Sequence, residues 1–354
     1  MAYTTIDNPE LFFQTVLWTG SGSARSITLP GSEDMQPDWV WGKNRGNDDN
    51  DYLLDSIRGV AQRITTNNTQ PEGTSSTLLT AFNSDGFSLG TSAGLNASGV
   101  TAVAWCWKAG TSFSNDASAT SVGTIDSTGT VNDTAGFSIV AYTGTGSAGT
   151  VKHGLSTTPS MILVKSRTGT YGWGMYHHKN TSAPATDYLS INNTDATVDD
   201  SVFWNDTAPT SSVFSLGGTD AINKSTNTHI AYCFAEKKGY SKFGSYIGNG
   251  SADGTFVHTG FKPAWVMIKQ SSGSGTSWNI WDNKRLGYNT KNYQLEANTI
   301  VVENTSLERL LITSNGFKCL TDNAQINGSG NTYIYMAFAE SPFVNSNGVP
   351  NNAR

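Results

Sequence analysis

The sequence predicts an all-β protein made of three tandem β-sandwich (jelly-roll-like) domains of one repeat family. Three observations support this. The same pattern of turns, prolines and lysines occurs three times along the 354 residues. The chain contains 37 glycines and only 14% charged residues, so its polar content is mostly Ser, Thr, Asn and Gly, as in strands joined by many turns. Short apolar runs alternate with polar residues, which is typical of half-buried strands.

Each repeat begins with a strand that ends in a G-x-G turn, followed by a second strand, a proline, an apolar strand and a lysine. Glycines are expected in this turn because tight hairpins place residues at positive φ. The equivalent positions are Gly20/Gly22, Gly144/Gly146 and Gly248/Gly250 for the turn, Pro37, Pro159 and Pro263 for the proline, and Lys43, Lys165 and Lys269 for the lysine. A repeat of this length is a whole domain, and we expect the same strand order in each copy.

These matches set the predicted boundaries: an N-terminal arm (1–12), repeat 1 (13–108), a polar linker (109–136), repeat 2 (137–238), repeat 3 (239–341) and a C-terminal tail (342–354). Repeats 2 and 3 are joined only by residues 235–242, which include Tyr240, so we expect these two to pack closely. The tail has no core of its own unless it docks on a neighbour.

The linker is small and polar, with Phe113 as its only aromatic residue. It has little apolar area to offset the entropy of ordering, so we expect a flexible or surface-laid segment that limited proteolysis cuts first. Its S-V-G-T-I-D and T-V-N-D alternation leaves a second possibility open, in which it lies along a domain as an extra strand.

Charge and hydropathy exclude several classes of partner. The net charge is −6 with no basic cluster, which disfavours nucleic-acid binding. No stretch approaches the ~18–20 apolar residues of a membrane span, so membrane insertion is not expected. The N-terminus lacks the basic start and apolar run of a signal peptide.

The sequence predicts no enzyme, no catalytic residues, no cofactor and no metal site. None of the common catalytic or phosphate-binding motifs occurs. His177 and His178 are adjacent and would point to opposite faces of a strand, which disfavours a shared metal. Asp48, Asp49 and Asp51 resemble a calcium loop only loosely, and a solvated loop is the favoured interpretation. Cys106 and Cys233 share one repeat position and, like Cys319, are interpreted as packing residues.

Two further patterns of polar and aromatic residues stand out in the sequence. An Asp-x-x-Arg spacing occurs at Asp55/Arg58 and Asp282/Arg285, and a turn-anchoring salt bridge is the favoured interpretation. Aromatic residues beside polar loop residues are typical of sugar-stacking surfaces, although core packing is the more common fate of Trp. The candidate glycan-binding residues are Trp173, Tyr176, Trp278, Trp281 and Tyr288.

The stretches SITLPGSEDMQPDWVWGKNR, AGFSIVAYTGTGSAGTVKHGLSTTPSMILVKSR and AYCFAEKKGYSKFGSYIGNGSADGTFVHTGFKPAWVMIK resemble a repeat family of tailed bacteriophages, abundant in marine phages and often present in tandem. The resemblance covers nearly the whole chain. It implies a virion component assembled in the bacterial cytoplasm, and it transfers no binding or catalytic residues.

On this basis we expect a structural protein on the virion surface. The preferred role is a tail-fibre or adhesin component that contacts host surface polysaccharide. A head decoration protein that binds the capsid is the alternative, and a glycan-degrading enzyme is disfavoured because no carboxylate pair in a groove can be located. Expected partners are other virion proteins and identical copies, since virion surface proteins are usually multicopy and symmetric.

Overall fold

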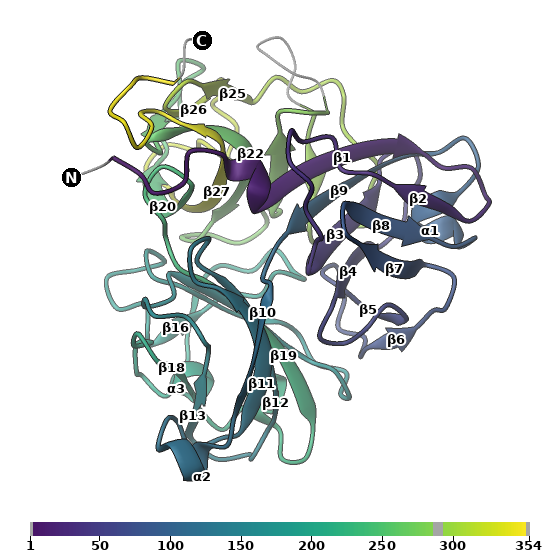
Figure 1. Ribbon diagram of the computed structural model, residues 1–354. Helices are drawn as coiled ribbons and strands as arrows, with labels where there is room; N and C mark the ends of the chain where they lie inside the picture. Colours follow the sequence, from purple (N-terminus) through teal and green to yellow (C-terminus); the bar gives the residue numbers. More distant parts are fainter. Residues whose placement is uncertain (1–2, 286–292, 352–354) are drawn as a thin grey trace.

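A computed structural model of the chain describes residues 3–285 and 293–351. Figure 1 shows the three repeats as three lobes arranged around a common centre, with repeat 1 in purple to blue, repeat 2 in teal and repeat 3 in green to yellow. Each lobe contains a large antiparallel sheet and one or two small ones. The all-β fold predicted from the sequence, with β-sheets packed as in a β-sandwich, is therefore confirmed.

Repeat 1 begins after a short 3-10 helix η1 (Pro9–Leu11). Its large sheet has the order β1 (Phe13–Thr19), β9 (Thr101–Trp107), β3 (Trp39–Asn44), β4 (Asp51–Asp55), β5 (Gln62–Thr65) and β6 (Gly73–Thr74). The small sheet has the order β2 (Arg25–Ile27), β8 (Gly86–Leu89) and β7 (Leu79–Asn83), and the helix α1 (Ala93–Asn96) leads into β9.

Repeat 2 has the large-sheet order β10 (Thr111–Asn115), β11 (Ser127–Asn132), β12 (Phe137–Thr143), β19 (Thr228–Phe234), β14 (Met161–Ser166) and β15 (Gly174–His177). Two pairs of strands complete it: β13 (Gly149–Lys152) with β18 (Val213–Leu216), and β16 (Asp187–Tyr188) with β17 (Val198–Asp199). Its helices are α2 (Ala117–Thr120), α3 (Ser201–Trp204) and α4 (Asp220–Asn223).

Repeat 3 has the large-sheet order β20 (Ser241–Ile247), β27 (Thr332–Pro342), β22 (Phe261–Gln270), β23 (Asn279–Asp282) and β24 (Leu295–Glu296). Its small sheet has the order β21 (Phe256–His258), β26 (Gly316–Cys319) and β25 (Leu310–Thr313). Among the described residues, no helix has the length and apolar character needed to cross a membrane.

The strand order recurs in all three repeats, as predicted. The first strand of each repeat pairs with the last, the last pairs with the third, and the second pairs with the next-to-last in the small sheet. This nested pairing of the first two strands with the last two is jelly-roll-like. It explains why the same turn and strand residues recur in the sequence, because each copy must make the same hairpins and the same crossings.

The first glycine of each G-x-G turn is required by close backbone contact. A Cβ added at Gly20, Gly144 or Gly248 would lie 2.1, 2.3 or 2.3 Å from a backbone carbonyl oxygen in the loop before the last strand of the repeat. The second glycines, Gly22 and Gly146 among them, have positive φ, at 70° and 74°. The turn is thus locked against the loop that enters the last strand.

We expect Gly144→Ala to destabilise the protein by about 1–3 kcal/mol, since a methyl group cannot be accommodated against the fixed carbonyl of Lys224. Gly46→Ala is the matched control, because an added Cβ there would meet its nearest neighbour at 3.5 Å. Urea denaturation of both variants checks this. Equal midpoints for the two variants would contradict the close-contact explanation.

Residues 109–136 are not a flexible linker, so that prediction is wrong. They contain β10, β11 and α2, and β11 pairs with β12 in continuous register from Ser127↔Tyr142 to Asn132↔Phe137. Asp116 caps α2, and Phe113 and Val131 pack against the core of repeat 2. Backbone pairing and these few apolar contacts order a segment whose composition is polar. The extra-strand alternative is the one the structure adopts.

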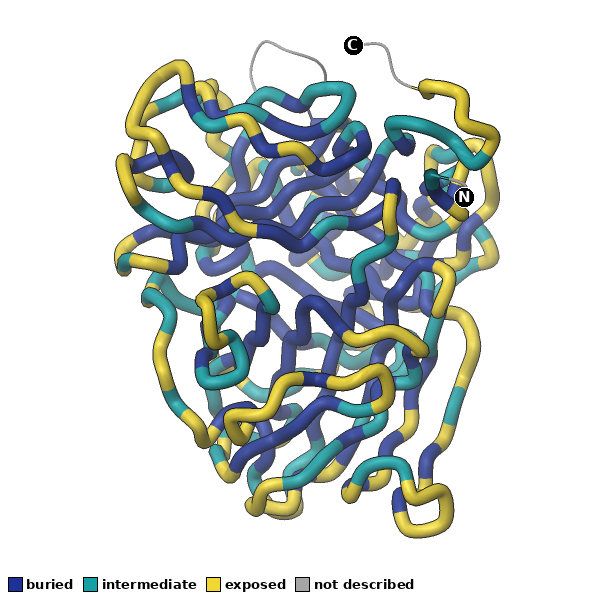
Figure 2. Tube along the Cα trace, turned by 90° about the vertical axis from the view of Figure 1, so that its left-hand side faces the viewer, coloured by how far each residue is buried: buried dark blue, intermediate teal, exposed yellow. Residues whose placement is uncertain are grey.

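The apolar residues form one core inside each lobe and a further core that all three lobes share. The first kind lies between the large and small sheets of each repeat. The shared core lies between the three large sheets and includes Trp39, Trp107, Tyr232, Trp265 and Phe338. Figure 2 shows this as buried chain running through the middle of the molecule, with exposed segments in the outer loops. The three sandwiches therefore share a core rather than standing as separate units.

The two ends of the described chain also pack on this body. Tyr3 Oη donates to the Gly260 carbonyl at 2.8 Å, and the backbone N–H of Ser346 donates to the Asp7 carboxylate at 2.7 Å. Tyr240 of the connector 235–242 is 1% exposed and contacts the Phe12 and Phe338 rings. The arm, connector and tail thus join repeat 1 to repeat 3 as well as repeat 3 to repeat 2.

Candidate functional site: the seams between the repeats

The aromatic residues proposed to bind glycans do not form a surface. Trp173, Tyr176, Trp278 and Trp281 are 0%, 4%, 1% and 0% exposed, so their ring faces are not open to a sugar. The prediction fails at these four positions, because tertiary packing covers loops that look polar in the sequence. Tyr288 lies outside the described residues.

Trp173 and Trp278 instead link neighbouring repeats. The Trp173 indole N–H donates to the Thr65 carbonyl of repeat 1 at 3.0 Å, and the Trp278 indole N–H donates to the Ser190 carbonyl of repeat 2 at 3.0 Å. Each ring also belongs to the shared core. These residues lie in the contact zones between repeats, which we call the 1–2, 2–3 and 3–1 seams after the repeats that they join.

We therefore expect Trp173→Ala and Trp278→Ala each to lower the free energy of unfolding by about 3–5 kcal/mol, the usual cost of truncating a buried Trp. Chemical denaturation followed by circular dichroism measures this. Variants that unfold at the wild-type midpoint would overturn the core assignment and restore the surface interpretation.

The repeat lysine predicted at the end of the apolar strand crosses a seam in all three copies. Each lysine is 0% exposed and donates to the carbonyl of an equivalent threonine in another repeat. The contacts are Lys43 Nζ to Thr299 O at 2.8 Å, Lys165 Nζ to Thr69 O at 3.0 Å and Lys269 Nζ to Thr194 O at 3.2 Å. Repeat 1 thus reaches repeat 3, repeat 2 reaches repeat 1, and repeat 3 reaches repeat 2, which closes a ring.

Burial changes the acid–base behaviour of two of these lysines. Desolvation lowers the pKa of Lys165 and of Lys269 to about 8. Both side chains remain mostly protonated at neutral pH, so their hydrogen bonds to the threonine carbonyls are charge-assisted and strong. Lys43 also forms an ion pair with Asp51, with 2.7 Å between Lys43 Nζ and Asp51 Oδ2.

Two of the seams carry a buried charged bridge. In the 1–2 seam Arg58 contacts Asp55 at 2.6 Å and Glu72 at 3.3 Å, and Glu72 also holds Arg167 of repeat 2 at 2.8 Å. In the 3–1 seam the equivalent contacts are Arg285–Asp282 at 2.6 Å, Arg285–Glu303 at 2.9 Å and Glu303–Arg45 at 2.7 Å. The predicted Asp-x-x-Arg ion pairs are confirmed, and they are buried parts of larger networks.

The Asp of each bridge also accepts a hydrogen bond from the neighbouring repeat. Tyr232 Oη donates to Asp55 at 2.7 Å, and the Trp105 indole N–H donates to Asp282 at 2.9 Å. Sequence reasoning missed Glu72, Glu303, Arg45 and Arg167. The G-K-N-R and V-K-S-R endings of the two lysine strands were an available signal for the arginines.

The 2–3 seam has histidines instead. His177 stands three residues before Asn180, as Asp55 stands three before Arg58. Its Nε2 lies 3.2 Å from the Tyr335 carbonyl, and His178 Nε2 lies 2.7 Å from the Phe243 carbonyl. Desolvation, with a smaller effect of His178, lowers the pKa of His177 to about 3. The ring is therefore neutral at pH 7 and donates its N–H to the carbonyl.

A buried asparagine fixes the G-x-G turn of every repeat, a feature that sequence reasoning also missed. Asn96, Asn223 and Asn327 are at most 1% exposed. Each accepts a hydrogen bond from the backbone N–H inside the turn and donates to two carbonyls. The recurring L-N-A-S-G, I-N-K-S-T and I-N-G-S-G segments carried this signal.

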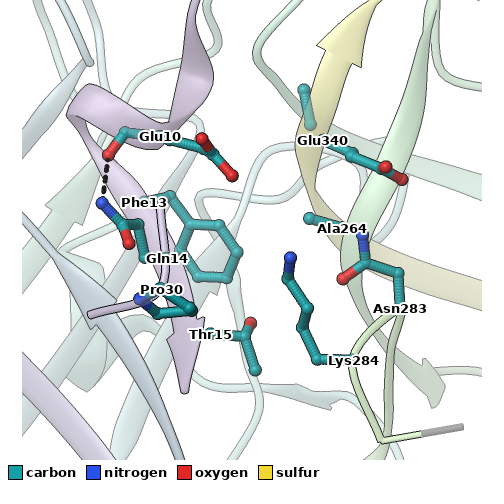
Figure 3. A pocket seen from close by; sticks show the side chains of 10 residues that line it. Glu10, Phe13, Gln14, Thr15, Pro30, Ala264, Asn283, Lys284 and Glu340 are labelled. Carbon is teal, nitrogen blue, oxygen red and sulfur yellow. Dashed lines mark hydrogen bonds between the residues drawn. The ribbon is translucent and has the colours of Figure 1, made fainter. Parts of the chain in front are cut away.

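A small hollow with a volume of about 20 Å³ lies in the 3–1 seam. Figure 3 shows Lys284 extending between β1 and the end of β23, with Glu10 and Glu340 on opposite sides of the opening. Thr15 Oγ1 and Asn283 Oδ1 are buried there without a hydrogen-bond partner among the described residues. A volume of this size holds about one water molecule, so the hollow is a small packing defect between two repeats and is too small for a substrate.

In the described residues, no group of three or more His, Cys, Asp and Glu side chains is placed to hold a metal ion. Cys106, Cys233 and Cys319 are free and buried, which confirms their interpretation as packing residues. Burial raises the pKa of the Cys319 thiol to about 11, so it is not a reactive thiolate at neutral pH.

The fold and the seams define an all-β protein in which three sandwich-like repeats pack around one aromatic core. The chain belongs to a family described as a domain of unknown function (DUF7483), whose model matches residues 8–342. The match runs through all three repeats and their connectors, in agreement with the shared core. No curated protein matches the chain.

Proposed function

We propose that this protein is a structural component on the surface of a tailed-phage virion, part of a tail fibre or adhesin that contacts host surface glycans. The observation that carries the proposal is the ring of three seams around a shared aromatic core. Surface components of a particle must keep their shape when the particle meets its host. Buried ion pairs across the 1–2 and 3–1 seams, and aromatic ring contacts across all three seams, favour such a rigid role over a mobile one.

A head decoration protein is the second candidate, and one observation favours it. Both ends of the described chain fold back onto the body through the Tyr3–Gly260 and Asp7–Ser346 contacts. This gives a compact block, of the kind that binds a capsid lattice by one face. The two candidates place the same block on different parts of the particle.

Localisation on the virion tests both candidates. Cryo-EM of the particle, with an antibody against the purified protein as an independent label, should find multiple symmetry-related copies on the tail for the first candidate. Copies on the head would establish the second. Absence from purified particles, or one isolated copy that touches no identical chain, would contradict the proposal.

A further inference from the structure

The three seams share one backbone framework, which allows their side chains to be compared position by position. The backbone N–H of Glu72 donates to the Arg167 carbonyl at 2.8 Å, and that of Glu303 donates to the Arg45 carbonyl at 3.0 Å. In the 2–3 seam the N–H of Thr197 donates to the Ser271 carbonyl at 3.0 Å. Thr197 and Ser271 therefore occupy the positions of the bridging glutamate and of the arginine that it holds.

The 2–3 seam lacks the charged bridge: besides His177 in place of the aspartate, its other three positions differ. Asn180 replaces Arg58 and Arg285, Thr197 replaces the glutamate, and Ser271 replaces the second arginine. Each replacement is shorter and uncharged. The volume that two arginines and a glutamate fill in the other seams is left to three small polar side chains.

A hollow of about 390 Å³ lies at this place and is lined by these three residues together with hydroxyl and ammonium groups of both repeats. The other lining residues that matter are Lys179 from repeat 2, and Ser245, Ser272 and Thr332 from repeat 3. Its volume falls within the range of small-ligand sites. Its opening faces solvent, since Lys179 and Ser245 are exposed.

One buried polar group in the hollow has unused hydrogen-bonding capacity. Asn180 is 3% exposed, and its Oδ1 accepts from Thr197 Oγ1 at 2.7 Å. Its Nδ2 donates to no protein group in the part of the chain that the structure describes, so these two donor hydrogens are available to a ligand. At the rim, the Lys179 ammonium has no carboxylate within ion-pair distance among the described residues.

We propose that this hollow is a carbohydrate site for a sugar that bears a carboxylate. The seam amide and hydroxyls match the alternating donors and acceptors of sugar hydroxyls, and Lys179 matches the carboxylate. No aromatic ring lines the hollow, so the sugar is held by hydrogen bonds and one charge. Single-site affinity should then be on the order of millimolar, and multiple copies on a particle would supply avidity. This inference deepens the proposed glycan contact and rests on it.

The probes are D-glucuronate and its uncharged counterpart D-glucose, titrated into the full-length ¹⁵N-labelled protein by NMR. We expect saturable shifts around Lys179–Ser182 and Ser271–Ser272, with glucuronate binding at least severalfold more tightly than glucose. The exposed-site variant Lys179→Gln should remove that preference and leave weak binding of both sugars. No saturable shift with glucuronate at ~50 mM, far above a weak-site affinity, would overturn the assignment.

The other seams supply the matched control. The triple variant Asn180→Arg/Thr197→Glu/Ser271→Arg introduces the arginine–glutamate–arginine part of the charged bridge into the 2–3 seam and fills the hollow. Because His177 stands where the other seams have the aspartate, we expect a lower thermal midpoint than the wild type, together with loss of the binding of both sugars. Binding that survives in a folded triple variant would refute the site. If the triple variant does not fold, the Lys179→Gln variant tests the site, and a glucuronate preference that it retains would refute the assignment.

The outcome is separable from the proposed function. A site that binds glucuronate in a protein absent from the virion would refute the virion role alone. If the protein is found on the virion surface but its hollow binds neither sugar, only this site is refuted.

Discussion

Asp282→Ala should lower the free energy of unfolding by about 3–5 kcal/mol, the cost of leaving a buried charge without its partner. The side chains of Asp282 and Arg285 are both 0% exposed, and the Asp282 carboxylate also accepts a hydrogen bond from the Trp105 indole N–H across the 3–1 seam. The substitution removes the hydrogen-bond acceptor that the Arg285 guanidinium and the Trp105 indole N–H share. Urea denaturation at neutral pH measures the loss.

Asp220→Ala is the matched control, since the Asp220–Lys224 pair is 51% and 39% exposed and solvent screens it. It should leave the midpoint nearly unchanged. The double variant Asp282→Leu/Arg285→Met should be less destabilised than Asp282→Ala, because it removes both charges. A single variant as stable as the control would show that the bridge contributes little to the seam.

Acidification should destabilise the 2–3 seam through His177. Its pKa is about 3 in the folded protein and about 6.5 when unfolded, so the unfolded state binds more protons between these values. The stabilising contribution is complete above pH 6.5 and falls as the pH drops towards 3. The full shift corresponds to about 4–5 kcal/mol.

His177→Gln keeps an N–H donor for the Tyr335 carbonyl and removes the titration, so the variant should lose less stability than the wild type between pH 6.5 and 4. His258 is exposed and out of the seam, and His258→Gln should follow the wild-type curve. Denaturation midpoints of the wild type and of both variants, measured at a series of pH values, test this expectation. Parallel curves for wild type and His177→Gln would contradict the assignment.

The repeat pattern predicted much of the fold because each copy makes the same local hairpins. Gly144, Pro159 and Lys165 marked the right turns and strands, and the alternation around Cys106 and Cys233 indicated buried packing correctly. These features depend on neighbours within one repeat, so sequence periodicity reports them.

The seams could not be predicted in the same way, because they join residues that are distant in the chain. Trp173 follows a polar loop, yet it lies in the core that all three repeats share and donates to the Thr65 carbonyl of repeat 1. One signal was present: the lysine strands read as continuous apolar runs, and in the structure β3 and β14 are buried at every position. Such strands are covered on both faces, which indicates a second core. A buried lysine at the end of each run needs a partner, and only the fold places Thr69, Thr194 and Thr299 there.

Differential scanning calorimetry of the full chain tests most directly whether the three repeats form one cooperative body. With one shared core and three closed seams, we predict a single transition whose calorimetric and van't Hoff enthalpies agree, with a ratio of ~1. Separate transitions, or a ratio of ~2–3, would show that the repeats unfold independently and that the shared core does not couple them.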